Sequence, residues 1–318
     1  MHGTPVSASP DFPQRGLMRR SIARHLYHRL LLVAALAAGS VLAQQTGATP
    51  QIWEVRSAGN AVYLLGSIHL GRSDMYPMGP VVERAYQASK IVALEADPTD
   101  QQAVMAAISG SLYQPPENLQ KNLPGPLLAK VSRTLERYGI PLEQAQPMKP
   151  FLVAITLASI EYARAGFDPS LGVDMHFAGR ARQDGKPVVE LESFGGQIAL
   201  MNNMSNRLQQ SLLQVTLESI DNGEIPALVD SMVNAWKSGD GKKLQDAVST
   251  EEHKLPAALA QEFHRKLITD RNIAMAGKIE TMLKGSDVHF IAIGAAHLLG
   301  RDSVLQILSE KGYRVRPL

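Results

Sequence analysis

Short, mainly apolar runs recur along the chain, and glycine, asparagine or charged residues close them. Such runs, rich in Val, Ile, Leu and aromatic residues, predict strands that a sheet buries on both faces. The first two runs flank a Ser-Ala-Gly-Asn segment that contains turn residues, so we expect a β-hairpin there. The predicted strands are residues 52–56, 61–65, 91–95, 187–192, 288–293 and 313–317.

Between these runs, apolar residues return every three or four positions, which is the period of an amphipathic helix. The predicted helices are residues 80–89, 172–183, 194–222, 224–238, 256–283 and 302–311, and residues 99–166 are helical in pattern. Strands alternate with helices in the outer thirds of the chain, while the middle is mostly helical. This order predicts an α/β fold of α+β-like character, in which helices flank a central mixed sheet.

The same pattern follows two of the predicted strands. Gly66 and His69 frame Gly-Ser-Ile-His after the run at 61–65, and Gly294 and His297 frame Gly-Ala-Ala-His after the run at 288–293. Glycine would let the backbone turn where each strand stops. With 25 Gly and 9 His in the chain, roughly one Gly-x-x-His arises by chance, so the weight rests on the duplication and its shared context. We expect the helical middle to form an insertion or cap between these two halves.

Carboxylates follow two other strands: Glu95 ends one, and Glu192 ends another, with Glu190 two residues earlier as a bystander. If these strands share one sheet, two imidazoles and two carboxylates meet at its carboxyl edge. Together, His69, His297, Glu95 and Glu192 would be a ligand set for a divalent ion, which lowers the pKa of a bound water. A carboxylate off the metal would act as general base or acid. Loop histidines bonded to carbonyls, and acids that cap helices, remain the structural alternatives.

The predicted helix at 256–283 carries two polar residues, Arg271 and Asn272, on its apolar stripe. A buried guanidinium must be paired, so Arg271 either locks a structural carboxylate or faces the site and stabilises an oxyanion. Asp174 is a candidate partner for it. We interpret the remaining histidines after residue 43 as surface or packing residues: His176, His253, His264 and His289.

The composition of the chain excludes several kinds of site and disfavours nucleic acid as a partner. The chain has 318 residues, of which 45% are hydrophobic, enough for a proper core. It has no cysteine, which excludes disulfides, thiolate metal sites and cysteine nucleophiles. The net charge is +2; residues 1–43 hold five Arg and one Asp, so taking away their +4 leaves −2 for the rest. Nothing in this balance favours nucleic acid as a partner.

The first 43 residues predict a secretory signal peptide. Arginines precede an apolar segment at 30–38, and small residues at 41–43 suit cleavage after Ala43. Met18 is the better start of this leader. The domain would then be single, over 44–318, periplasmic or secreted and without a stable membrane span; an uncleaved anchor in the inner membrane is the alternative.

Several short segments, in order, resemble the TraB/GumN family, which is related to the TIKI metalloproteases and, more distantly, to erythromycin-esterase and ChaN-like proteins. These segments are GSIHL (66–70), LEAD (94–97), GVD (172–174), GKPVVELESFGGQ (185–197), DRN (270–272) and GAAHLLG (294–300). The resemblance implies an α/β fold of two related halves, with His69 and His297 as motif histidines. It also implies Glu95 and Glu192 as site acids and Arg271 as the family arginine, with Asp174, Gln197 and Asn272 in the matched segments beside them.

Some members of this family are divalent-metal-dependent proteases. We therefore expect a metal-dependent hydrolase, with a peptidase as the narrower expectation, that acts on a peptide or a small ester or amide. The ion would be Zn, Mn, Co or Fe. Two alternatives stay open: a metal-independent, histidine-based hydrolase of the esterase kind, and a non-catalytic protein that binds peptides or glycans. The oligomeric state stays open as well.

Overall fold

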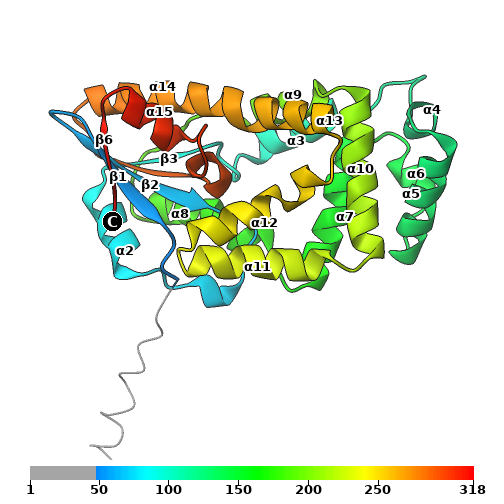
Figure 1. The fold of residues 1–318 in the computed structure, drawn as a ribbon, viewed down its shortest axis with the longest axis horizontal. Helices are drawn as coiled ribbons and strands as arrows, with labels where there is room; N and C mark the ends of the chain where they lie inside the picture. Colours follow the sequence, from blue (N-terminus) through cyan, green and yellow to red (C-terminus); the bar gives the residue numbers. More distant parts are fainter. Residues whose placement is uncertain (1–47) are drawn as a thin grey trace, which may run out of the picture. The chain divides into compact units, whose positions relative to one another are not determined.

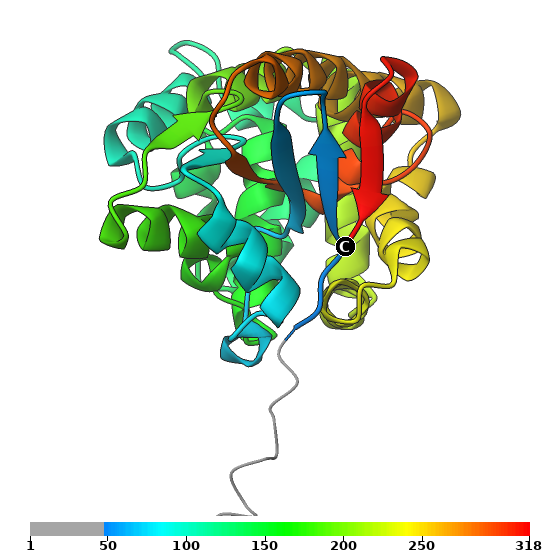
Figure 2. The ribbon, with the colours of Figure 1, turned by 90° about the vertical axis from the view of Figure 1, so that its left-hand side faces the viewer.

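The apolar runs pair into one mixed sheet. The computed structural model describes residues 48–318, and in this part of the chain the strand order is β4-β3-β5-β2-β1-β6. The four strands from β4 to β2 are parallel, whereas β1 is antiparallel to β2 and β6 to β1 (Figure 2). The bounds are β1 (Ile52–Arg56), β2 (Ala61–Ser67), β3 (Ile91–Leu94), β4 (Val188–Glu190), β5 (His289–Gly294) and β6 (Arg314–Pro317). The predicted mixed sheet, hairpin and final edge strand are confirmed.

The register of the parallel strands determines which residues leave the sheet together. Ser67 at the end of β2 pairs with Gly294 at the end of β5. On the other side of β5, Ala292 pairs with Leu94, the last residue of β3. The segments that follow these strands therefore start from one edge of the sheet, where α/β proteins collect ligands.

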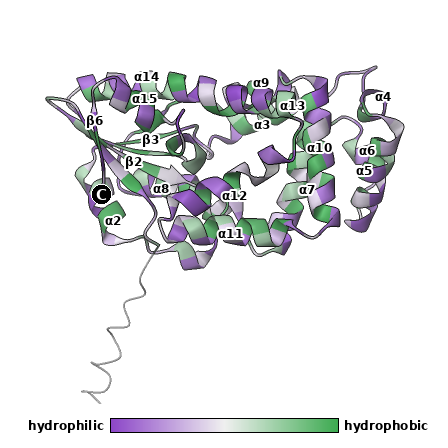
Figure 3. Ribbon diagram, viewed as in Figure 1, coloured by the Kyte–Doolittle hydropathy of each residue, from purple (hydrophilic) through white to green (hydrophobic). Residues whose placement is uncertain are grey.

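Helices cover both faces of the sheet (Figure 1). Phe290 and Ala292 of β5 face the core shared with α2 (Pro80–Ala88), α8 (Val173–Gln183) and α11 (Ile225–Lys237). Ile291 and Ile293 face the opposite core, shared with α14 (Asp270–Lys284) and α15 (Val304–Glu310). Successive strand residues thus enter different cores, which explains why the runs are apolar without alternation. Along α14, hydrophilic and hydrophobic residues alternate as expected of a helix with one buried face (Figure 3).

The remaining helices form the insertion that the sequence predicts between the two Gly-x-x-His segments. Helices α4 to α7 and α10 pack around a core of their own, away from the sheet. Their bounds, with those of the other helices and of short turns, are η1 (Ser73–Met75), α3 (Gln101–Gly110), α4 (Leu119–Asn122), α5 (Gly125–Arg137), α6 (Leu142–Ala145), α7 (Pro150–Arg164), η2 (Pro169–Leu171), α9 (Phe194–Asn202), α10 (Asn206–Asp221), α12 (Gly241–His253), α13 (Ala257–His264), η3 (Arg265–Thr269) and η4 (Ala295–Leu298).

Three helical predictions need correction. The segment 194–222 is two helices, because Ser205 caps a new helix by accepting a hydrogen bond from the Leu208 amide. The segment 256–283 is α13 and α14 joined by a π-helical turn, η3. Helix α12 was not predicted at all. The predicted signal peptide lies outside the described residues, and so does the start of the predicted domain. No helix within residues 48–318 is long and apolar enough to span a membrane.

Gly66 has a different role from the predicted one. It lies inside β2 and is absent from the glycines with positive φ. A Cβ on Gly66 would lie 3.2 Å from the Cα of Ala295, so its small size permits close approach of η4 to β2. The Gly66 carbonyl also accepts a 2.7 Å hydrogen bond from the indole Nε1 of the buried Trp236. This bond ties α11 to the strand that precedes His69.

We expect Trp236→Phe to lower the free energy of unfolding by about 2–3 kcal/mol, because it leaves a gap and an unpaired buried carbonyl. Urea unfolding followed by circular dichroism measures the effect. Trp53→Phe is the control: Trp53 is only partly buried in β1, so its loss is below about 1 kcal/mol. Equal losses in both variants would contradict the role of the Trp236 bond.

Candidate functional site

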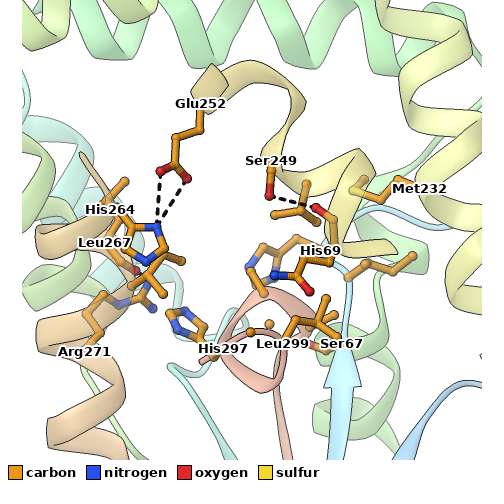
Figure 4. Close-up of a pocket in the computed structure, with 18 of the residues that line it drawn as sticks. Ser67, His69, Met232, Ser249, Glu252, His264, Leu267, Arg271, His297 and Leu299 are labelled. Atoms are coloured by element: carbon orange, nitrogen blue, oxygen red, sulfur yellow. Dashed lines mark hydrogen bonds and ion pairs between the residues drawn. The ribbon is translucent and has the colours of Figure 1, made fainter. Parts of the chain in front are cut away.

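A cavity of about 680 Å³ lies beyond the carboxyl edge of the sheet. His69, Glu95 and His297, which follow β2, β3 and β5, are among its lining residues, and so is Arg271 of α14. In Figure 4, His69 and Arg271 lie on opposite sides with His297 between them, and α12 crosses above with Glu252. The strand-end histidines therefore share one cavity.

The imidazole of His69 forms a dyad with Asp174. Nδ1 of His69 lies 2.8 Å from Oδ2 of Asp174, in the first turn of α8. Ser67 donates to the other oxygen, Oδ1, at 2.7 Å. Asp174 is buried, whereas 68% of the His69 side chain is exposed. The bond at Nδ1 fixes the ring and directs Nε2 away from Asp174. Asp174 is therefore not the partner of Arg271, contrary to our prediction.

Charge pairing shifts the pKa values of this dyad. The negative charge of Asp174 raises the pKa of His69 from 6.5 to about 9, so the ring is cationic at neutral pH. Burial alone would raise the pKa of Asp174, but the nearby His69 charge and hydrogen bonds hold it below its ordinary value. The dyad is thus an imidazolium–carboxylate pair at neutral pH.

The surroundings of His297 favour the neutral form of its ring, whereas those of His69 favour the charged form. Its Nδ1 lies 2.6 Å from Oδ1 of Asn272, and the Asn272 amide group donates to the Asp302 carbonyl at 2.7 Å. That second bond orients the amide, so its oxygen faces His297 and Nδ1 must carry the proton. Burial lowers the pKa of His297 from 6.5 to about 4. The ring is neutral at pH 7, with its lone pair on Nε2.

Arg271 joins the two predicted acids. Its Nη2 donates to Glu95 Oε2 and to Glu192 Oε2, each at 2.7 Å, and its Nε donates to both oxygens of Glu192. Nη1 donates to the Leu267 carbonyl. Gln197 of α9 adds a bond to each carboxylate, at 3.1 Å to Glu95 and 3.0 Å to Glu192. Arg271 thus binds both carboxylates, and we call Arg271, Glu95, Glu192 and Gln197 the clamp. Because the guanidinium is already engaged in these bonds, the structural interpretation of Arg271 is favoured over that of an oxyanion donor.

Glu95 connects this clamp to the second Gly-x-x-His segment. Its Oε1 accepts the Gly294 amide hydrogen bond and lies 3.5 Å from Nε2 of His297. A Cβ on Gly294 would lie 2.9 Å from the same oxygen, so the carboxylate requires glycine there. Burial by itself would raise the pKa of Glu192, but Arg271 holds it below its ordinary value of 4.5.

The donor set fits a divalent ion only in part. Nδ1 of each imidazole is bonded to an oxygen, an arrangement common in metal-binding histidines. The oxygens of Glu95 and Glu192 are already engaged by Arg271, Gln197 and the Gly294 amide. Across residues 48–318, no three His, Asp or Glu side chains are grouped to hold a metal. The predicted four-ligand site is therefore not assembled in this arrangement.

Sequence reasoning missed a second histidine–carboxylate contact in the cavity. His264, which we assigned to the surface or to packing, lines the cavity, and its Nδ1 lies 3.2 Å from Glu252 Oε1. Four residues of α12 also line it: Gln245, Val248, Ser249 and Glu252. The signal that could have revealed this helix is the apolar set Leu244, Ala247 and Val248, which has i, i+3, i+4 spacing.

The fold and site define an α/β protein in which two strand-end histidines, Glu95 and Arg271 line one cavity, while Glu192 lies behind them and binds Arg271. Residues 51–317 match the TraB/PrgY/gumN family, and the chain belongs to that family, as its sequence motifs predicted. It is 26% identical over 248 residues to the uncharacterized protein YbaP of Escherichia coli, covering 77% of this chain and 87% of YbaP. No solved structure matches the chain.

Relatives named metalloproteases are more distant. The chain is 24% identical over 302 residues to metalloprotease TIKI1 of Danio rerio, covering 80% of this chain and 60% of that protein. It is 25% identical over 311 residues to metalloprotease TIKI2 of Xenopus tropicalis, covering 83% and 59%.

We expect Asp174→Asn to lower the pKa of His69 from about 9 toward the ordinary 6.5, because the largest cause of the shift is the Asp174 charge. Titration of the histidine ring protons by NMR measures this. Ser67→Ala serves as the control, since it removes a bond to Asp174 but keeps the ion pair. A His69 pKa that stays near 9 without the Asp174 charge would refute the dyad.

For the clamp, we expect Arg271→Gln to cost about 3–5 kcal/mol of stability at pH 7, because two buried carboxylates lose their cation. Arg137→Gln is the control: its pair with Asp221 is exposed, and its loss costs below about 1 kcal/mol. Urea unfolding at several pH values measures both.

The difference in stability between wild type and Arg271→Gln should depend on pH. Arg271 holds the pKa of Glu192 below 4.5, so the stabilisation is present above that pH and is lost as the pH falls through the lowered pKa. The gap between wild type and Arg271→Gln therefore shrinks on acidification. A gap that stays constant with pH would mean that the charge pairing does not cause it.

Proposed function

We propose that this protein is a hydrolase of amide or ester bonds, whose catalytic groups are His69 and His297. The observation that carries the proposal is the contrast between two imidazoles in one cavity: His69 is paired with the Asp174 carboxylate, which raises its pKa to about 9, whereas His297 is buried against the Asn272 amide, and burial lowers its pKa to about 4. Environments that separate the pKa values of two titratable groups provide an acid and a base at the same pH.

In this proposal, a water in the cavity attacks the substrate carbonyl carbon. Nε2 of His297 takes the proton of the water, and Glu95, 3.5 Å from that nitrogen, stabilises the imidazolium that forms. His69 donates a hydrogen bond from Nε2 to the carbonyl oxygen as it gains negative charge, and Asp174 holds the ring. When the tetrahedral intermediate collapses, the carbon–nitrogen or carbon–oxygen bond breaks, and the imidazolium of His297 gives the proton that it took from the water to the leaving amine or alcohol.

Arg271 and Glu192 would support this chemistry without touching the substrate. The clamp fixes Glu95 beside His297, because Arg271 and Gln197 hold one carboxylate oxygen while the Gly294 amide holds the other. Because the Glu95 carboxylate is held in place, it needs little reorganisation during the reaction.

A metal-dependent form of the same hydrolase is the second candidate. It is favoured by the relatives named metalloproteases and by the bonds that anchor Nδ1 of both imidazoles and leave each Nε2 for a ligand. His69 would have to lose a proton to bind an ion there, and the carboxylates would have to leave Arg271. We place either form in the periplasm or outside the cell, on the ground of the leader at 1–43 alone.

The test uses p-nitrophenyl esters and amino-acid p-nitroanilides. We expect wild-type hydrolysis, and losses in kcat/KM of about 10²–10⁴-fold in His69→Ala and His297→Ala. His289→Gln is the control, because His289 begins the same strand that leads to His297, at the opposite edge of the sheet. Binding of these compounds without turnover would refute the proposal.

The pH profile and the metal content separate the two candidates. Without a metal, kcat/KM rises as His297 deprotonates near pH 4 and falls as His69 deprotonates near pH 9, and EDTA has no effect. If the metal-dependent form is correct, protein purified without chelator contains about one equivalent of metal. His69→Ala would then lack the metal, and EDTA would abolish the activity of the wild type.

A further inference from the structure

The walls of the cavity differ in character from its floor. The floor carries His69, His297, Glu95 and Arg271, whereas apolar side chains from six segments line the walls. They come from the residue after His69, from α11, α12, α13 and η3, and from the end of η4: Leu70, Met232, Val248, Phe263, Leu267 and Leu299.

The protein itself covers these apolar side chains only in part. Val248 is 37% exposed although it faces a cavity. Leu70, Met232, Phe263, Leu267 and Leu299 are all partly exposed. Apolar surface left open in a concave site is the usual sign of a ligand with an apolar part.

Helix α12 forms one of these walls with the face next to its buried side. Leu244 and Ala247 are buried, whereas Gln245, Val248 and Ser249 line the cavity from an adjacent stripe. Glu252, one turn further along, contacts His264 of α13. Figure 4 shows Met232 and Ser249 on the same side of the cavity as His69. An apolar wall therefore lies next to the group that would meet a carbonyl or carboxylate.

We propose that the cavity takes a carbonyl compound that carries a large apolar group, with the carbonyl or carboxylate oxygen at Nε2 of His69 and the apolar group against Met232, Val248 and Leu70. Turnover of such a compound depends on the proposed function, whereas its binding does not. The apolar group is either an acyl chain or a large amino-acid side chain, and both present the same chemistry to the walls.

Calorimetry with carboxylates that the protein cannot hydrolyse tests the binding. For butanoate, hexanoate, octanoate and decanoate, we expect one site, with Kd falling about fourfold per methylene until the cavity is filled. 3-Phenylpropanoate and propanoate, which contain no amide or ester bond, form the second arm; tighter binding of the former than of octanoate assigns the cavity to a side chain, and the reverse assigns it to an acyl chain. A Kd that is independent of apolar size in both arms overturns the proposal.

Variants of α12 locate the ligand. Val248→Asp should raise the Kd of octanoate at least tenfold, and Val248→Trp should shift the preference to shorter chains, because it fills space beside His69. Ile273→Asp is the matched control, since Ile273 is 59% exposed on α14 and does not line the cavity; its Kd should stay within twofold of wild type. Circular dichroism confirms that each variant is folded. Wild-type binding in both Val248 variants overturns the proposal.

Hydrolysis of p-nitrophenyl esters with the same acyl chains separates this inference from the proposed function. Chain-length-dependent binding without cleavage of any ester would leave the inference standing and refute the hydrolase. Cleavage of all the esters at the same kcat/KM would keep the hydrolase and overturn the inference.

Discussion

The pairing of Arg271 with Glu95 and Glu192 is the interaction on which the site depends. Only 14% of the Arg271 side chain is exposed, and neither a buried guanidinium nor two buried carboxylates are tolerated without partners. Because Glu95 follows β3, Glu192 follows β4 and Arg271 lies in α14, this cluster ties two strand ends to a helix on one face of the sheet. It also holds Glu95 against the Gly294 amide and beside His297.

The two histidines acquire different properties from different surroundings. His69 meets a carboxylate, Asp174, and remains partly exposed, so its charged form is favoured. His297 meets an amide oxygen, of Asn272, and is buried, so its neutral form is favoured. The same Gly-x-x-His pattern thus gives one cationic and one neutral imidazole. This asymmetry is what makes acid–base chemistry in one cavity plausible on physical grounds, whichever bond is broken.

The cavity combines a polar floor and apolar walls because they come from different parts of the fold. The floor is supplied by the ends of parallel strands, where the backbone leaves the sheet. The walls are supplied largely by α11, α12 and α13: α11 and α12 bury their other faces in a core shared with the sheet, and α13 packs against a smaller core with α10. Helix α12 shows the division: Leu244 and Ala247 are buried, and Val248 is left open to the cavity.

The sequence alone determined the strands, because the central ones are apolar runs buried on both faces and the edge strands are short runs next to turn residues, and it also determined the family, through its short motifs. It brought His69, Glu95, Glu192 and His297 forward as strand-end residues. It did not determine which side chains pair: Asp174 was a candidate partner for Arg271, yet it bonds His69. Partners such as these are 105 residues or more apart in the chain, so only the register of the sheet and the packing of α8 and α14 on it decide which side chains meet.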